Sequence, residues 1–163
     1  MKKRNTQRVR FLTLSAMIAA LYVVLTLLSA AFGLSSGVIQ VRISEALCAL
    51  TFFTPAAVPG LAIGCLISNI ATSASLLDVV FGTLATLLGA LGGRALKNHK
   101  NLVTLPTVLA NTLIIPLVIV YGFGVTDIAL PIVALSVCAG ELISATLFGT
   151  VLLHILEKYN LKW

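Results

Sequence analysis

Residues 11–32, FLTLSAMIAALYVVLTLLSAAF, decide the class of this protein. The stretch carries no charge, and at about 1.5 Å rise per helical residue it can cross a hydrocarbon layer about 30 Å thick. Similar runs fill most of the chain, of which 59% is hydrophobic and only 10% charged, with a mean hydropathy of +1.09. A membrane is therefore the expected solvent, and no soluble catalytic domain remains.

The pattern predicts one all-α membrane domain over residues 1–163. Six apolar segments can be drawn, at 11–32, 40–54, 56–73, 76–93, 103–121 and 130–154. They give a six-helix bundle over 11–154, between a basic tail at 1–10 and a second tail at 155–163. Pro55 and Pro59 separate the second segment from the third in a tight hairpin, because proline removes a backbone donor and crowds the preceding turn. Residues 33–37, 73–75 and 122–127 are predicted loops.

The basic residues predict the orientation. With six crossings, ten of the 11 Lys and Arg residues fall on one face: Lys2, Lys3, Arg4, Arg8, Arg10, Arg94, Lys97, Lys100, Lys158 and Lys162. The positive-inside rule makes that face, and both termini, cytoplasmic. A cleavable signal ending at Ser29-Ala30-Ala31 is the alternative, but its apolar stretch exceeds the usual signal core of about 7 to 15 residues.

Six polar residues stand out inside the apolar segments. Arg42, Glu45, Asn69 and Asp78 lie toward the outer ends of their helices, whereas Asn111 and Glu141 lie near mid-depth. A charge at the bilayer centre costs about 2.5 to 3.5 kcal/mol on insertion scales, so such groups usually face a cavity or a partner. The inner half carries almost nothing ionisable. We therefore expect a polar pocket open to the outside and closed below.

Most of these residues also have a structural interpretation. Arg42 and Glu45, at i and i+3, can form a surface ion pair with each other. Asp78 follows Ser75 with the spacing of a capping box, which we rank ahead of binding. Asn69 and Asn111 can serve as polar contacts between helices.

Glu141 is harder to assign to structure alone. Pro131 fixes a helix start, so the carboxylate lies about 15 Å deeper at about 1.5 Å per residue. An intramembrane carboxylate at this depth is a functional residue by default.

Small residues indicate close helix packing. Ala16 and Ala20 share one face of the first helix, and Gly60/Gly64 and Gly89/Gly93 repeat the spacing, which usually means internal packing. Three cysteines, Cys48, Cys65 and Cys138, lack metal or disulfide spacing and are interpreted as small buried hydrophobes. Both histidines, His99 and His154, are interpreted as solvated or interfacial. We expect no metal, no cofactor and no nucleic-acid partner.

Four stretches, IQVRISEAL (39–47), FFTPAAVPGLAIGCLISN (52–69), DVVFGTLATLLGAL (78–91) and AGELIS (139–144), closely resemble the QueT family of queuosine-precursor transporters. These are membrane substrate-binding subunits (S components) of energy-coupling factor (ECF) transporters. The most specific part is 41–69, and the resemblance reaches from the first helix beyond Glu141. Thr51 departs from the pattern, which favours proline there and so a local kink.

The resemblance implies a six-helix protein of the bacterial cell membrane that captures a 7-deazaguanine such as preQ1 or preQ0. It would dock on a transmembrane coupling subunit driven by two ATP-binding-cassette ATPases, with membrane lipid around it. Arg42 and Glu45 would lie at the pocket mouth, and Ala16 and Ala20 would contact the coupling subunit. No GxxxxGK[ST] stretch for nucleotide binding is present.

The chemistry of a guanine-like ligand suits these residues. Its adjacent N–H donors match a carboxylate, and preQ1 adds a cationic aminomethyl group. Glu45 and Glu141 are candidates for the two tasks in either order, with Arg42 orienting Glu45. Asn111 is a candidate for the remaining edge, and Tyr121 or Phe81 for the ring face.

Three rival functions remain open to different degrees. An intramembrane enzyme would use Ser35, Ser36 or Ser144 as nucleophile, but needs a base within hydrogen-bond reach, and both histidines lie at the opposite face. A small channel or structural subunit would need no discrete ligand and would predict a continuous polar path, against which the nonpolar inner half argues. An S component for a different vitamin is compatible with the residues alone.

Overall fold

A computed structural model describes the whole chain except residues 1, 35–40, 73–74, 123, 125–127 and 160–163. The described part is all helical, in agreement with the predicted fold class. Its elements are α1 (Lys2–Ala31), η1 (Ile43–Thr51), α2 (Ala57–Thr72), α3 (Leu76–Ala95), η2 (Lys100–Leu102), α4 (Leu105–Gly122), α5 (Leu130–Glu141), η3 (Leu142–Phe148) and α6 (Gly149–Lys158).

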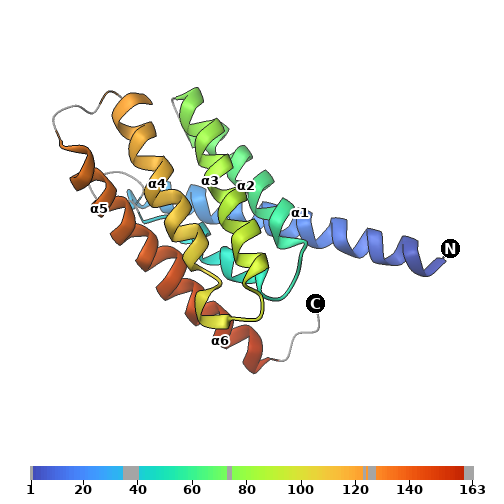
Figure 1. The fold of residues 1–163 in the computed structure, drawn as a ribbon. Helices are drawn as coiled ribbons and strands as arrows, with labels where there is room; N and C mark the ends of the chain where they lie inside the picture. Colours follow the sequence, from blue (N-terminus) through green and yellow to red (C-terminus); the bar gives the residue numbers. More distant parts are fainter. Residues whose placement is uncertain (1, 35–40, 73–74, 123, 125–127, 160–163) are drawn as a thin grey trace.

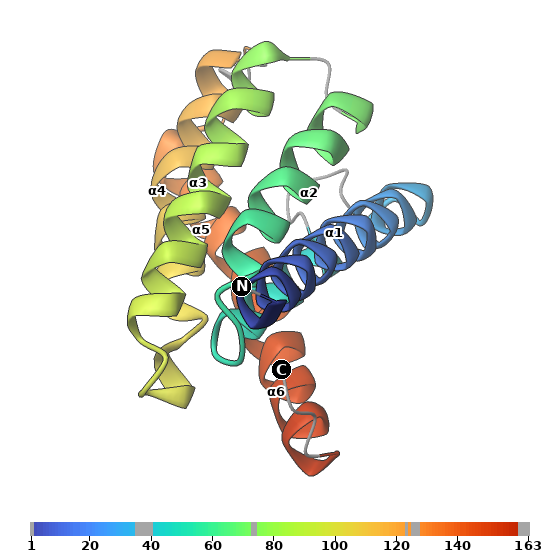
Figure 2. The same cartoon turned by 90° about the vertical axis from the view of Figure 1, so that its right-hand side faces the viewer.

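Consecutive helices pack side by side in the order α1, α2, α3, α4, α5 (Figure 1). Helix α1 crosses the bundle at a steep angle, and its N-terminal part projects beyond the other helices (Figure 1); Figure 2 shows it crossing in front of α2. It begins at Lys2 because nothing in the basic segment 1–10 breaks a helix, so the predicted tail continues α1. The last predicted segment is a continuous run of α5, η3 and α6.

Four stretches of the described chain are long and apolar enough to cross a membrane, at Arg4–Ala31, Leu76–Ala95, Lys100–Gly122 and Leu130–Lys158; α2 is a shorter apolar helix. Large apolar side chains point outward from these helices, and Leu113 and Leu135 are each 70% exposed. Soluble proteins seldom leave so much contiguous apolar surface uncovered. The protein is therefore an all-α membrane protein.

The second predicted segment differs from a membrane-crossing α-helix. It contains η1, a 3₁₀-helix of nine residues, of which all but Ile43 are buried, and η1 contacts α1, α2, α3, η3 and α6. At about 2.0 Å per residue, it is shorter than the hydrocarbon layer. Irregular backbone at membrane depth is tolerated only where protein covers it, and here the surrounding helices do so.

The chain still passes through the bundle at η1. Its N-cap residue, Arg42, lies beside Asp78 in the first turn of α3, and its last residue, Thr51, contacts Gly93 near the other end of α3. The segment thus runs alongside α3 in the same direction, opposite to that of α2. Pro55 falls in the break between η1 and α2, as predicted, whereas Pro59 lies in the first turn of α2.

Glycines set the helix spacing. A Cβ atom on Gly64 would lie 2.7 Å from the Tyr22 Cβ, and one on Gly60 would lie 2.8 Å from the Ser15 carbonyl oxygen, so both glycines let α2 pack directly on α1. Gly89 and Gly93 contact the chain around Thr107 and Thr51 in the same way. The predicted internal packing of both pairs is confirmed.

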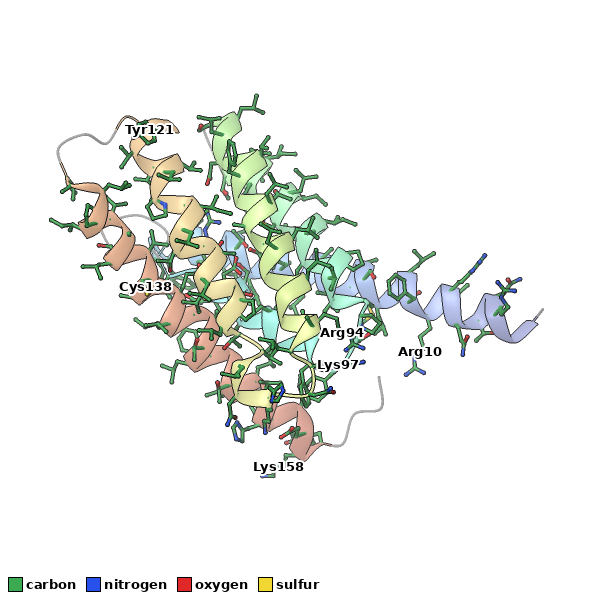
Figure 3. All side chains as sticks on the ribbon, viewed as in Figure 1. Arg10, Arg94, Lys97, Tyr121, Cys138 and Lys158 are labelled. Atoms are coloured by element: carbon green, nitrogen blue, oxygen red, sulfur yellow. The ribbon has the colours of Figure 1, made fainter. Side chains whose placement is uncertain are left out.

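Cationic side chains gather at one end of the bundle, here called the basic end. Arg94, Lys97 and Lys158 lie there, while Tyr121 lies at the opposite end (Figure 3). Arg94 fastens this end, because its Nη1 donates to the carbonyl oxygens of Thr51 at 3.0 Å and Phe52 at 3.2 Å. Those carbonyls end η1 and would otherwise lack partners. Lys100 of η2 and Glu157 of α6 form an ion pair close by.

Candidate functional site

A small cavity lies where η1, α4 and α5 meet. It measures about 20 Å³ and is lined by Arg42, Asn111, Ile115, Val137 and Glu141. Two of the lining residues are apolar and three bring polar groups to one point, as small-molecule sites do. Three of the residues selected from the sequence by depth and charge are therefore brought together. The space holds about one water molecule, so the site is closed in this conformation.

Arg42 lies at the centre of the charged cluster. Its Nη2 is 3.9 Å from the Asp78 Oδ2, and its guanidinium also interacts electrostatically with Glu45 and Glu141. Among the described residues, the partner of Arg42 at ion-pair distance is Asp78 on α3 rather than Glu45. The reason is the backbone: Arg42 precedes η1 in an extended conformation, φ −101° and ψ 100°, so helical i, i+3 spacing does not apply to it.

Asp78 also lies at a capped helix start. Ser75 is the N-cap of α3, and its side chain accepts a hydrogen bond from the Leu77 backbone N–H at 3.2 Å. The predicted helix start is therefore confirmed. The Asp78 carboxylate, on the first turn where the helix dipole favours a negative charge, faces Arg42 at the same time.

Glu45 is held by α1. It is only 2% exposed, and its Oε1 accepts a hydrogen bond from the Tyr22 hydroxyl. One turn further along α1, Thr26 donates to the Ser44 Oγ at 2.8 Å. Tyr22 and Thr26 were not among the residues selected from the sequence. A signal was present, because Ser15, Tyr22, Thr26 and Ser29 recur at helical spacing in an otherwise apolar helix and all four are buried.

Glu141 carries one of five buried side-chain atoms that lack a hydrogen-bond partner among the described residues. Its side chain is 8% exposed, and its Oε2 has no hydrogen-bond partner among the described residues. The Asn111 side chain is a hydrogen-bonding neighbour of this carboxyl group. A buried acceptor without a donor is costly, and such atoms call for an explanation. An N–H donor from a ligand in the cavity would provide one.

Irregular backbone surrounds this carboxylate. The seven residues after Glu141, η3, form a π-helix, and Pro116 lies inside α4 one turn beyond Asn111. Proline removes one i→i−4 hydrogen bond from α4, and π-helical turns occur frequently at functional sites. Both helices that line the cavity are therefore interrupted near it.

Asn69 connects helices, as the structural interpretation predicted. Its Nδ2 donates to the Asp78 carbonyl oxygen at 3.3 Å and to the Cys65 Sγ at 3.4 Å, linking α2 to α3. Thr86 of α3 donates to the same sulfur at 3.2 Å. Cys65 is thus buried, as expected for a small hydrophobe, but it also belongs to a polar cluster that spacing did not reveal.

Two predicted aromatic contacts are not at the cavity. Tyr121 is 76% exposed at the end of α4, and Phe81 is 42% exposed on α3. Ala16 and Ala20 both lie on the outer face of α1, opposite the buried Tyr22. They therefore remain available to an external partner.

Those residues of the rival enzyme that the structure describes are not brought together. Ser144 is buried in η3, whereas His154 is exposed on α6 with its Nδ1 2.8 Å from the Thr150 carbonyl oxygen. His99 is exposed beside η2. Ser35 and Ser36, with most of the predicted 33–37 loop, lie outside the described residues. Parts of the predicted loops at 73–75 and 122–127 lie outside them as well.

A family model described as QueT transporter matches residues 12–158. The chain belongs to the QueT transporter family. A curated relative, the queuosine precursor transporter QueT of Lactococcus lactis subsp. cremoris, is 42% identical over 73 residues, which are 45% of this chain and 43% of that protein. The match thus spans less than half of the curated relative. No solved structure matches the chain. The residues matched by the family model include Arg42, Glu45, Asn111 and Glu141.

Proposed function

We propose that this chain is the substrate-binding membrane subunit of an ECF-type transporter that takes up a queuosine precursor, a 7-deazaguanine of the preQ1 or preQ0 type. The observation that carries the proposal is the enclosed cavity with the unpaired Glu141 Oε2 beside Asn111 and Arg42. Membership of the QueT family and the printed name of the Lactococcus lactis relative supply the substrate class.

The composition of the cluster suits a cationic ligand. Three acidic side chains, Glu45, Asp78 and Glu141, surround the single guanidinium of Arg42. A positive charge brought close to buried carboxyl groups stabilises their ionised form. The aminomethyl ammonium of preQ1 supplies that charge, and the N–H donors of the guanine-like edge suit a second carboxylate. The Asn111 amide complements the remaining edge.

Substrate entry requires the site to open. A fused two-ring ligand does not fit a cavity of about 20 Å³. The interrupted helices α4 and α5 are the elements best able to move away from η1, because each already lacks regular α-helical bonding near the cavity.

Binding by single-charge variants tests the substrate proposal. The purified protein in detergent is titrated with preQ1 in a calorimeter, next to Glu45→Gln and Glu141→Gln. Each variant keeps the side-chain shape but loses the charge. Glu141 lines the cavity, and a charge-assisted hydrogen bond contributes about 1.5 to 3 kcal/mol, so Glu141→Gln should bind preQ1 at least tenfold more weakly. Glu45 interacts electrostatically with Arg42 and Glu141, which line the cavity, so Glu45→Gln should weaken binding as well. Glu157→Gln, at the basic end, is the matched control and should bind like wild type.

Two outcomes would count against this assignment. Wild-type protein that binds neither preQ1 nor preQ0, but co-purifies with another small molecule, would point to a different vitamin. Unchanged affinity in both Glu45→Gln and Glu141→Gln would remove these carboxylates from the site. Mass spectrometry of compounds extracted from the purified protein distinguishes the first case.

The partners follow from the same proposal. The chain has no nucleotide-binding motif, so energy would come from a transmembrane coupling subunit with two ATPases. Ala16 and Ala20 form an exposed small-residue stripe on α1 that permits close packing with another helix. Ala16→Leu or Ala20→Leu should reduce uptake in cells while leaving preQ1 affinity unchanged. Ala95→Leu, at an exposed alanine of α3, is the control, and loss of binding in Ala16→Leu would contradict the docking role.

The orientation completes the proposal. We propose that the basic end and both termini face the cytoplasm, which the cations at that end and the positive N-terminal segment of α1 support through the positive-inside rule. Asp78, at the start of α3, then lies toward the exterior, and the substrate would enter from that side.

A further inference from the structure

The inner face of α1 carries a line of polar contacts to the segment that bears Arg42 and Glu45. Tyr22 donates to the Glu45 Oε1, and Thr26 donates to the Ser44 Oγ at 2.8 Å. The Ser29 Oγ accepts the Ile43 backbone N–H at 3.1 Å. Successive turns of α1 thus hold three consecutive residues of the chain, 43 to 45.

These contacts are buried and rigid. Tyr22 is 1% exposed, and Thr26, Ser29 and Ser44 are at most 3% exposed. The Tyr22 Cβ lies so close to Gly64 that a Cβ added there would be 2.7 Å away, which pins the base of the tyrosine side chain against α2. A hydrogen bond between fixed and desolvated partners restricts orientation more strongly than one exposed to water.

Glu45 does not line the cavity itself but interacts electrostatically with two residues that do, Arg42 and Glu141. Its carboxylate needs a donor, since a buried carboxylate with unpaired oxygens is costly. The Tyr22 hydroxyl supplies a donor at one oxygen, Oε1, and thereby fixes the direction of the other. The position of this charge relative to the cavity is therefore set from α1.

We propose that Tyr22 is a positioning residue for substrate binding, which acts through Glu45 and makes the inner face of α1 part of the binding site. This inference rests on the proposed function. It extends the site to the helix whose opposite face carries Ala16 and Ala20. If a partner bound to the outer face of α1 displaced this helix, the Tyr22 side chain would transmit the displacement to Glu45.

The test is preQ1 binding by Tyr22→Phe, which keeps the ring and removes only the hydroxyl. We expect affinity at least tenfold weaker than wild type. Tyr159→Phe, at an exposed position after α6, is the matched control and should bind within twofold of wild type. Wild-type affinity in Tyr22→Phe would overturn the inference. Absence of binding by the wild type would instead overturn the proposed function.

A second comparison separates positioning from packing. Charge-assisted hydrogen bonds are roughly twice as strong as neutral ones, so in a Glu45→Gln background the tenfold effect of Tyr22→Phe should fall to about threefold. An equal loss in both backgrounds would mean that Tyr22 does not act through the Glu45 charge. If Tyr22→Phe does not yield folded protein, Thr26→Val removes the next contact along α1. It should weaken binding at least threefold, and unchanged affinity there would refute the inference.

Discussion

Replacement of Gly64 by alanine tests how closely α1 and α2 depend on each other. The new methyl carbon would lie 2.7 Å from the Tyr22 Cβ, 2.9 Å from the Ala19 carbonyl oxygen and 3.1 Å from the Ala19 Cα. Neither the two backbone atoms nor the root of the tyrosine side chain can move without moving α1 itself. The helices must therefore separate by several tenths of an ångström.

The expected magnitude follows from two opposing effects. Overpacking of a well-packed interface costs typically 1–3 kcal/mol, and three close atoms at once place Gly64→Ala near the upper limit. Alanine is favoured over glycine within a helix by about 1 kcal/mol. The net loss in free energy of unfolding should therefore be about 2 kcal/mol.

Gly122→Ala is the matched control, because a Cβ there would meet its nearest atoms at 3.4 Å, an ordinary contact distance. Unfolding is followed by circular dichroism in mixed micelles with an increasing fraction of dodecyl sulfate. Gly64→Ala should unfold at a clearly lower fraction, while Gly122→Ala should match or exceed wild type. Equal stability of the two variants would refute the argument that direct α1–α2 contact requires glycine.

Three further predictions concern the basic end. Arg94→Gln loses the charged donor to the two carbonyls that end η1 and should lower the free energy of unfolding by about 2 kcal/mol in the same assay; an unchanged midpoint would show that these carbonyls find other donors. Lys100→Gln breaks a largely exposed ion pair with Glu157 and should cost under about 1 kcal/mol, whereas a larger loss would mean that the pair is effectively buried. Lys97→Cys should react with a membrane-impermeant maleimide only after cells are opened, and reaction in intact cells would reverse the proposed orientation.

The sequence predicts the long helices well because their lengths follow from the thickness of the bilayer. The segment at 76–93 corresponds to α3, Leu76–Ala95, and that at 103–121 to α4, Leu105–Gly122. The 3₁₀ geometry of η1 could not be predicted in this way. Apolar composition indicates only that a segment avoids water. It does not distinguish a segment enclosed by protein, such as η1, from an α-helix that faces lipid.

The site was predictable in part, by charge and depth. Arg42, Asn111 and Glu141 meet at one cavity because groups that are costly in lipid must share an enclosed space. Tyr22 was missed because a tyrosine in an apolar run is indistinguishable from a packing residue until its hydroxyl has a partner. The Arg42–Asp78 contact was missed because it joins residues 36 positions apart, beyond any local spacing rule.

The π-helical segment η3 that follows Glu141 is the point at which α5 could rotate relative to α6. A turn closed by i→i+5 bonds holds about one residue more than an α-turn. If η3 tightened into regular α-helix, α5 would rotate against α6 by about 100°, the angle of one residue at 3.6 residues per turn. Such a rotation would change the direction of the Glu141 carboxylate, while α6 stayed packed against η1. A backbone rearrangement confined to these seven residues would thus change which side of α5 faces the cavity.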